Sequence, residues 1–194
     1  MTAPLSEHCL VSLVPAAFLN RAGELTEVYT EVYCRPPWNE SPAAAEAFRA
    51  RLPADTARPG FTGFVAYETH CRILGFGYAY TTAGPVPDHG MYRMVRAILG
   101  PAADRLPGRV EVVEVAVRPA ARRRGLGRAL LAGLVGQRAA WLVTNPGIGD
   151  TVAFYDRLGW VRHGPVGNLL LYTSPPAPIR TRPASRLGCI TPLG

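Results

Sequence analysis

Arginines and glycines are concentrated in one short stretch of this sequence, and their spacing suits the binding of an anion. The stretch runs from Arg118 to Gly127 and contains four arginines and two glycines. A glycine lets a phosphate approach the backbone closely because no Cβ intervenes. Arginine side chains can add charge-assisted hydrogen bonds. These residue types therefore favour an anion site, if the neighbouring elements also present backbone N–H groups.

The segments on either side of this stretch provide such elements. Val110–Val117 is β-branched at most positions and carries two carboxylates, which predicts a strand. Apolar residues after Gly125 recur at the spacing of one helical face: Leu126, Leu130, Leu131, Leu134 and Val135. The first turn of a helix has unpaired N–H groups and a dipole that favours negative charge. A strand, a basic turn and a helix start together predict a phosphate site.

Two common phosphate motifs do not fit the stretch. Gly125–Leu130 begins like a dinucleotide fingerprint, but Leu130 stands where a third small residue is needed. No acidic residue lies near the distance expected for a ribose contact. The chain has no lysine, which excludes the nucleoside-triphosphate loop.

Arg122–Gly127, with the strand before it and the helix after it, resembles the acetyl-CoA-binding motif of the GNAT (Gcn5-related) N-acetyltransferases. A second block, Ala153–Trp160, is similar to the Phe-Tyr-x-x-x-Gly-Phe segment of that family. The resemblance covers roughly Leu10 to Thr173 and is sharpest from Val110 to Trp160. It implies an α/β fold with a central mixed, largely antiparallel sheet that splays between its fourth and fifth strands and is flanked by helices.

The resemblance also implies acetyl-CoA as cosubstrate and no metal. Pantetheine would pair with the backbone of Val115, Ala116 and Val117. The pyrophosphate would lie at the loop and helix start, formed by Arg122, Arg123, Arg124, Gly125, Leu126, Gly127, Arg128 and Ala129. Family members often have an asparagine about seven residues before the tyrosine of the second block. Here Ile148 has that spacing, and Asn145 could replace the contact if its turn is bulged.

Acetyl transfer to an amine needs a base for the amine and an acid for the leaving sulfur. Tyr155 matches the family tyrosine that protonates the sulfur, and a buried phenol needs a partner in any case. Glu111 and Glu114 compete for the role of base. They face opposite sides of a regular strand, unless a bulge intervenes. We favour Glu114 slightly, and a water-relayed base stays open.

The acceptor pocket is less well marked. Trp38 and Glu40 could hold a cationic amine by ring face and charge. The leading hypothesis is N-acetylation of a small primary amine by direct attack in a ternary complex. The alternatives are a protein N-terminal or lysine acetyltransferase, a catalytically idle CoA-binding regulatory module, and a nucleic-acid binder.

Composition bounds these hypotheses. The 194 residues include 21 basic ones, all arginine, and the formal net charge is +7. Because the arginines are spread along the chain, with the densest cluster inside the phosphate motif, nucleic-acid binding is not favoured. The cysteines form no CxxC pair and no zinc spacing, which indicates reduced thiols in a cytoplasmic protein: Cys9, Cys34, Cys71 and Cys189. No run reaches transmembrane length. Family members are often dimers, so a homodimer is also expected.

The remaining pattern predicts one domain, residues 1–174, followed by a flexible Pro/Arg-rich tail, residues 175–194. Proline or glycine clusters predict loops at Pro53–Gly60 and Pro101–Gly108. Asp150 is expected to cap a helix from Thr151 to Leu158. The other expected strands are Leu10–Val14, Phe61–Glu68, Arg72–Thr81, Trp141–Thr144, Trp160–His163 and Leu169–Thr173, and the other expected helices are Leu25–Tyr33, Pro42 to about Leu52, and Met91–Leu99.

Overall fold

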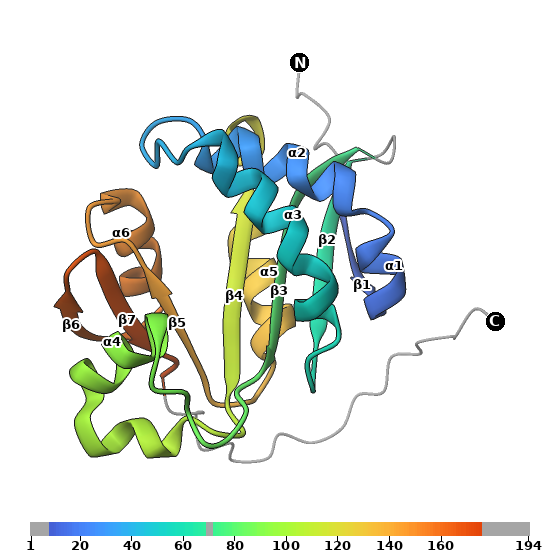
Figure 1. The fold of residues 1–194 in the computed structure, drawn as a ribbon. Helices are drawn as coiled ribbons and strands as arrows, with labels where there is room; N and C mark the ends of the chain where they lie inside the picture. The colour runs from blue at the N-terminus through green and yellow to red at the C-terminus, as the bar shows by residue number, and fades with distance from the viewer. Residues whose placement is uncertain (1–7, 69–71, 176–194) are drawn as a thin grey trace, which may run out of the picture.

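The computed structural model describes residues 8–68 and 72–175. Its centre is one seven-stranded sheet in the order β1-β2-β3-β4-β5-β7-β6 (Figure 1). Neighbouring strands are antiparallel except for the parallel pair β4 and β5. The strands are β1 (His8–Leu13), β2 (Thr62–Glu68), β3 (Ile73–Thr81), β4 (Val110–Val117), β5 (Ala140–Thr144), β6 (Val161–Val166) and β7 (Leu169–Thr173). The expected mixed, largely antiparallel sheet is confirmed.

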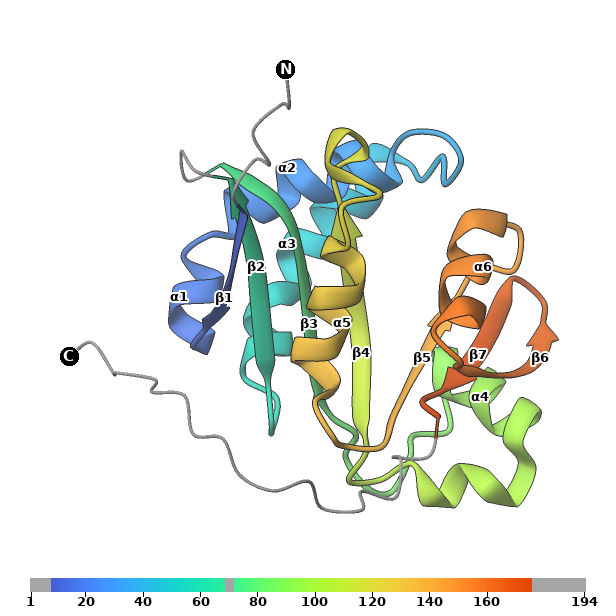
Figure 2. The same ribbon diagram turned by 180° about the vertical axis from the view of Figure 1, so that it is seen from behind.

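Helices cover both faces of this sheet (Figures 1 and 2). Helices α2 and α3 cover one face of β2–β4, and α5 covers the opposite face. Helix α4, followed by a 3₁₀ turn at Gly100–Arg105, contacts β6 and β7. The helices are α1 (Pro15–Leu19), α2 (Ala22–Tyr33), α3 (Pro42–Thr56), α4 (Gly90–Leu99), α5 (Leu126–Val135) and α6 (Gly149–Arg157). The five apolar residues predicted for one face of α5 are all buried.

Helix α3 runs past Pro53, so the loop expected at Pro53–Gly60 is wrong for its first four residues. A proline inside a helix removes one hydrogen bond and crowds the preceding turn. Tertiary contacts offset this cost, because Leu52 is fully buried and Asp55 accepts a hydrogen bond of 2.8 Å from the Tyr78 hydroxyl. The last turn of α3 is therefore held by the sheet below it.

Three other local expectations also need correction. Helix α6 begins at Gly149 with Ile148 at the cap position, so Asp150 lies in the first helical turn and does not cap it. Its charge still suits that end of the helix dipole. Part of the loop expected at Pro101–Gly108 is the 3₁₀ turn, and the short α1 was not expected. The tail predicted from residue 175 and two of the cysteines, Cys71 and Cys189, fall outside the described residues, apart from Pro175 itself.

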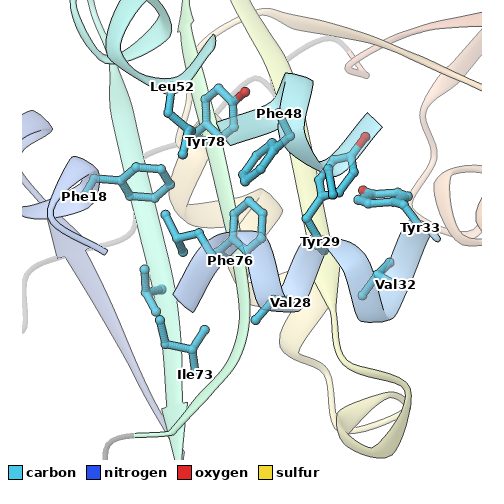
Figure 3. Close-up of a cluster of buried hydrophobic side chains, with 14 residues drawn as sticks. Phe18, Val28, Tyr29, Val32, Tyr33, Phe48, Leu52, Ile73, Phe76 and Tyr78 are labelled. Carbon is cyan, nitrogen blue, oxygen red and sulfur yellow. The ribbon is translucent and has the colours of Figure 1, made fainter. Parts of the chain in front are cut away.

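The largest buried cluster lies between α1–α3 and the sheet (Figure 3). Its aromatic rings pack closely, and the rings of Tyr29 and Phe48 stack at a centroid distance of 4.5 Å. Figure 3 shows the rings of Tyr29, Tyr33 and Tyr78 inside the cluster and their hydroxyls at its margin. Three tyrosines of this apolar cluster therefore place their hydroxyls at its edge, where they donate hydrogen bonds to Glu40, to the Val115 carbonyl and to Asp55.

Strand β4 contains a bulge that decides which way its carboxylates point. Opposite β3, Tyr78 pairs with Glu114 and Ala79 pairs with Val112, which leaves Val113 as an extra residue. An extra residue shifts the alternation of side chains by one position. Glu111 and Glu114 therefore lie on the same face of the sheet, the face covered by α2 and α3. A regular strand would have separated them.

Beyond the bulge, β4 has an open edge. Its pairing with β5 ends at Val112 and Leu142, and the two strands then diverge, as the predicted splay requires (Figure 1). The backbone carbonyl of Ala116 points toward β3, since it lies 2.6 Å from the place where Gly75 would carry a Cβ. Backbone groups of successive residues point to opposite edges of a strand. Those of Val115 and Val117 therefore point to the open edge.

Candidate functional site

A pocket of about 710 Å³ lies where β4 and β5 separate. Its walls come from the open edge of β4, the basic loop and start of α5, the facing part of β5, helix α6, and the end of α2 with the loop that follows. Both segments singled out by the sequence, the basic loop and the Phe-Tyr block, contribute to it. The residues of those two segments that line the pocket are Ala121, Arg122, Arg123, Gly125, Leu126, Gly127, Arg128, Phe154, Tyr155 and Arg157.

The start of α5 forms an anion site inside this pocket. Gly125 precedes the helix with φ of +80°, a conformation that glycine adopts without strain. Within the described chain, the first backbone amide of α5 to bond to a preceding carbonyl is that of Ala129, which bonds to Gly125 at 3.0 Å. The amides of Leu126, Gly127 and Arg128 are left for a ligand. The exposed side chains of Arg122, Arg123 and Arg128 surround them: these three arginines also line the pocket.

Two predicted members of the anion site lie elsewhere. Arg124 and Ala129 are not among the residues that line the pocket. The amide of Ala129 is already used inside the helix, so it has no N–H to offer a phosphate. The sequence motif alone could not separate these two residues from their neighbours.

The open edge of β4 offers the backbone groups that the resemblance assigns to pantetheine, but from two of the three expected residues. Val115 and Val117 line the pocket, and their carbonyls already meet polar side chains. The Tyr33 hydroxyl donates to the Val115 carbonyl at 3.2 Å, and the Arg122 Nε donates to the Val117 carbonyl at 3.3 Å. The backbone of Ala116 faces β3, so its expected contact with a ligand is not available.

Tyr155 lies on α6 and its side chain is only 7% exposed. Its ring packs against Tyr172 and Trp160, with centroid distances of 5.3 and 5.9 Å. Within the described residues its hydroxyl makes no hydrogen bond, although it borders the pocket. Burial and, next, the charge of Glu114 raise the pKa of Tyr155 above its ordinary value. The phenol is therefore protonated at neutral pH and can donate to a ligand.

Glu114 also lines the pocket, and its side chain is 12% exposed. An ion pair joins it to Arg51 of α3. Burial raises the pKa of Glu114 to about 7, while Arg51 and the neighbouring Tyr33 hydroxyl act in the opposite direction. A carboxyl group with this pKa can take up a proton near neutral pH.

Glu111 lies on the same face of β4 but does not line the pocket. It is 4% exposed and accepts hydrogen bonds from the hydroxyls of Tyr92, at 2.9 Å, and Tyr80, at 3.3 Å. Burial raises the pKa of Glu111 too. Of the two competing glutamates, only Glu114 can meet a ligand in this pocket.

Of the remaining predicted residues, two line the pocket and one does not. Trp38 and Glu40 line the pocket beside Tyr29 and Tyr33. The Tyr29 hydroxyl donates to Glu40 at 2.6 Å, and the rings of Trp38 and Tyr33 meet edge to face at 5.0 Å. Asn145, in contrast, does not line the pocket, because its side chain accepts a hydrogen bond of 2.8 Å from the Gly147 amide and stabilises the turn.

Sequence reasoning missed Arg51 and Tyr33. Arg51 carries a weak local signal, since it stands four residues before Asp55 on a helix, the spacing of an ion pair. Its partner Glu114 is 63 residues away in the chain, beyond the reach of any local pattern. Tyr33 was assigned only to the apolar face of a helix, and its hydroxyl contact with Val115 spans 82 residues.

Comparison with known proteins agrees with this architecture. The chain superimposes on an acetyltransferase of the GNAT family from Staphylococcus aureus with a TM-score of 0.61 and 11% identity, over 87% of this chain and 98% of that one. It matches the PaiA N-acetyltransferase of Thermoplasma acidophilum, solved in complex with coenzyme A, with a TM-score of 0.59 and 13% identity over 87% and 98% of the two chains. An acetyltransferase from Thermus thermophilus matches with a TM-score of 0.58 and 19% identity over 87% and 96%. A sequence search of curated proteins found no match.

The family assignment comes from the sequence itself. Residues 59–162 match the model of the acetyltransferase (GNAT) domain. In residues 8–68 and 72–175, no helix has the length and apolar character needed to span a membrane, and no cluster of three His, Cys, Asp or Glu side chains could hold a metal ion. Members of this family use acetyl-CoA as the acyl donor. The chain belongs to the GNAT acetyltransferase family.

Proposed function

We propose that this chain transfers an acetyl group from acetyl-CoA to the primary amine of a small molecule, by direct attack in a ternary complex. One observation carries the proposal: a single pocket contains the anion site of α5, the open edge of β4, Glu114 and Tyr155. A binding module without catalysis would need the first two features only. The presence of a carboxylate and a free phenol in the same pocket favours an enzyme.

Acetyl-CoA would lie along the gap between β4 and β5. Its pyrophosphate would accept hydrogen bonds from the amides of Gly127 and Arg128 and from the surrounding guanidinium groups. Its pantetheine arm would extend the sheet by pairing with Val115 and Val117 at the open edge of β4. In this arrangement the thioester reaches the region between Glu114 and Tyr155.

The chemistry then needs three proton transfers, two of which involve side chains of the pocket. Glu114 accepts a proton from the ammonium group of the acceptor, which leaves a neutral amine with a free electron pair. The amine nitrogen attacks the thioester carbonyl carbon, and the C–N bond forms as the C–S bond breaks. Tyr155 donates its hydroxyl proton to the departing sulfur. The nitrogen releases its remaining extra proton to solvent as the amide forms. The products are the N-acetylated amine and free CoA, and solvent returns Glu114 and Tyr155 to their starting protonation states.

The acceptor end of the pocket supports a cationic small molecule. Tyr29, Tyr33 and Trp38 supply aromatic faces, which attract ammonium groups. In the described chain Glu40 forms no ion pair, so its charge is available to the substrate. The pocket volume of about 710 Å³ is within the usual range for small-molecule sites. We therefore favour a small amine over a protein N-terminus or a lysine side chain.

We also propose that the protein works in the cytoplasm. Cys9 and Cys34 are free thiols, which suits a reducing compartment. A homodimer stays a prediction of the family resemblance.

The first test is calorimetric titration of acetyl-CoA into the wild-type protein and into Gly127→Glu. Gly127 lines the pocket at the start of α5, and a Cβ there would stand 3.4 Å from the Phe154 ring, so a glutamate adds its negative charge beside the anion site. We expect the affinity to fall by at least about 100-fold, because the added carboxylate and the pyrophosphate carry like charges and repel each other at short range.

A matched control is Gly23→Glu, which adds the same charge at an exposed position with open space around its Cβ. Its affinity for acetyl-CoA should equal that of the wild type. If Gly127→Glu also binds normally, the assignment of the α5 loop is wrong. A panel of small amines, assayed by release of the CoA thiol, then tests the transfer itself; no turnover with any amine would favour the catalytically idle module.

A further inference from the structure

Arg51 is held on three sides by groups of the layer between α3 and the sheet. Its guanidinium lies 3.4 Å from the Asp55 carboxylate and 3.3 Å from the Tyr78 hydroxyl. It also stands over the ring of Phe48, at 5.3 Å from the centroid. Asp55 is in turn fixed by the hydrogen bond from Tyr78. The side chain of Arg51 therefore has little freedom, although it is 37% exposed.

From this position Arg51 reaches Glu114. Its NH2 group donates to Oε1 of the Glu114 carboxylate. Glu114 lines the pocket but Arg51 does not, so the cation approaches the carboxylate from behind, on the side of α3. This contact engages one carboxylate oxygen without blocking the side that faces a ligand.

A carboxylate this buried needs such a partner. Transfer of an ionised carboxyl group out of water is unfavourable unless an opposite charge is close, and an isolated one stays protonated. Six charged or titratable groups face Glu114 or influence its charge, and among the described residues Arg51 is the one cation in this set: Arg51 from α3, Tyr29 and Tyr33 from α2, Glu40 from the loop after α2, Tyr78 from β3 and Tyr155 from α6. Asp55 of α3 contacts Arg51 itself.

The charge balance shows what Arg51 contributes. With Glu114 ionised, Arg51, Asp55 and Glu114 together carry one net negative charge. When Glu114 takes up a proton, the cluster becomes neutral. Without Arg51 the ionised state would place two negative charges in the same layer, with no cation to offset either.

We propose that Arg51 is a positioning residue that keeps Glu114 ionised and turned toward the pocket, ready to take the proton of the acceptor amine. The catalytic part of this inference rests on the proposed function, in which Glu114 is the base. The electrostatic part concerns only Arg51 and Glu114 and can be measured without any substrate.

The first experiment measures the titration of the Glu114 carboxyl carbon by ¹³C NMR, with the signal assigned from its loss in Glu114→Gln. In Arg51→Gln we expect the midpoint to rise by about 1–3 pH units, the usual effect of losing an adjacent opposite charge. Arg49→Gln is the matched control, because it removes the same charge from an exposed site on the same helix. A midpoint in Arg51→Gln equal to that of the wild type and of the control overturns the proposal.

The second experiment compares the pH dependence of kcat/KM. The acidic limb of the profile should move upward with the NMR midpoint in Arg51→Gln, and acetyl-CoA affinity should be unchanged because Arg51 does not line the pocket. Arg51→Lys keeps the positive charge, so its NMR midpoint and its acidic limb should lie close to those of the wild type. If Arg51→Gln does not fold, the midpoint measured in Arg51→Lys tests the proposal in its place. In a Glu114→Gln background, Arg51→Gln should cause no further loss of rate.

The outcomes separate the two proposals. If the wild type acetylates no amine, the proposed function fails, and the NMR titration still decides whether Arg51 controls the charge of Glu114. If the wild type is active but Arg51→Gln lowers the rate equally at every pH, Arg51 has a structural role only, and the positioning role is rejected.

Discussion

Two glutamates on the same face of β4 have opposite surroundings. Glu111 is 4% exposed and bonds to the hydroxyls of Tyr80 and Tyr92. Glu114 has the guanidinium of Arg51 behind it and an open pocket in front. Burial raises the pKa of both carboxyl groups, so this property does not distinguish them. Their partners do, since only Glu114 has a side available to a ligand.

The difference teaches that a buried carboxyl group with a raised pKa can belong either to a structural hydrogen-bond network or to a ligand site. Glu111 joins β3 and β4 to α4 through two phenols and completes its contacts within the protein. Glu114 leaves its contacts incomplete on the pocket side. The predictions below test whether catalysis and stability divide between these two groups as their surroundings indicate.

The largest effect is expected from Glu114→Gln. It keeps the shape of the side chain but removes the base, so kcat/KM should fall by about 1,000-fold, within the usual contribution of general base catalysis. Glu111→Gln is the matched variant, and its kcat/KM should stay within about threefold of the wild type because Glu111 does not line the pocket. Steady-state kinetics with one active amine measures both. A larger loss in Glu111→Gln would reverse the comparison.

Tyr155→Phe should lower kcat by about 100-fold while acetyl-CoA affinity stays nearly intact, because the variant removes only the proton donor. Tyr172→Phe provides the control. Its ring lies in the same cluster, but its hydroxyl donates to Asp156 at 2.9 Å and does not line the pocket. Rates and calorimetric affinities measured on both variants test the acid. An unchanged kcat in Tyr155→Phe would remove that role.

The pH dependence of the wild type should report Glu114 directly. Only the ionised carboxylate can accept a proton, so kcat/KM should rise about tenfold per pH unit below the pKa of about 7 and level off above it. A profile that is flat between pH 5 and about 8 would exclude a base with this pKa.

The free energy of unfolding should fall as the pH rises, whereas kcat/KM should increase. The pKa of Glu114 is raised from its ordinary value of 4.5 to about 7, so the folded chain holds this proton more tightly than the unfolded chain does. This stabilisation is complete below about pH 4.5 and is lost as the pH rises through about 7. Denaturant unfolding at several pH values should therefore show that the free energy of unfolding of the wild type falls between about pH 4.5 and about pH 7. The fall over the same pH range should be smaller in Glu114→Gln, which has no carboxyl group to titrate at this position. Equal slopes in the two proteins would contradict the raised pKa.

The smallest effect on activity is expected from Tyr92→Phe. This variant removes hydrogen bonds to both oxygens of Glu111 and should lower the free energy of unfolding by about 1–3 kcal/mol. Its kcat/KM should equal that of the wild type, because neither partner lines the pocket. Urea unfolding and steady-state kinetics on the same preparation would check both points. A loss of activity at unchanged stability would show that Glu111 acts in catalysis.

Local pattern predicted the part of the site that is local in the chain. Gly125 and the apolar spacing from Leu126 to Val135 lie in one continuous segment, so the strand, loop and helix could be placed from sequence. The Phe-Tyr block placed Tyr155 on a helix for the same reason. The ligand edge of β4 was predicted only approximately, because the direction of the Ala116 carbonyl depends on β3, the strand it pairs with.

The rest depends on contacts between distant segments. Neither the extra residue at Val113 nor the pairing of Arg51 with Glu114 has a signature within one window of sequence. Continuation of α3 beyond Pro53 required the hydrogen bond between Asp55 and Tyr78, which a local helix rule does not contain. Tertiary contacts outweighed local preference at each of these positions.

The extra residue Val113 has a consequence for how such a site can change. In a strand, the face on which a side chain lies and the edge to which its backbone groups point alternate together. Compared with a regular strand of the same residues, one residue accommodated as a bulge reverses both the face and the edge for every position that follows it. The same insertion that aligns Glu114 with Arg51 also turns the amide groups of Val115 and Val117 outward. The proton acceptor and the backbone that would receive pantetheine share one parity, so the same residues paired without the bulge would turn both away together.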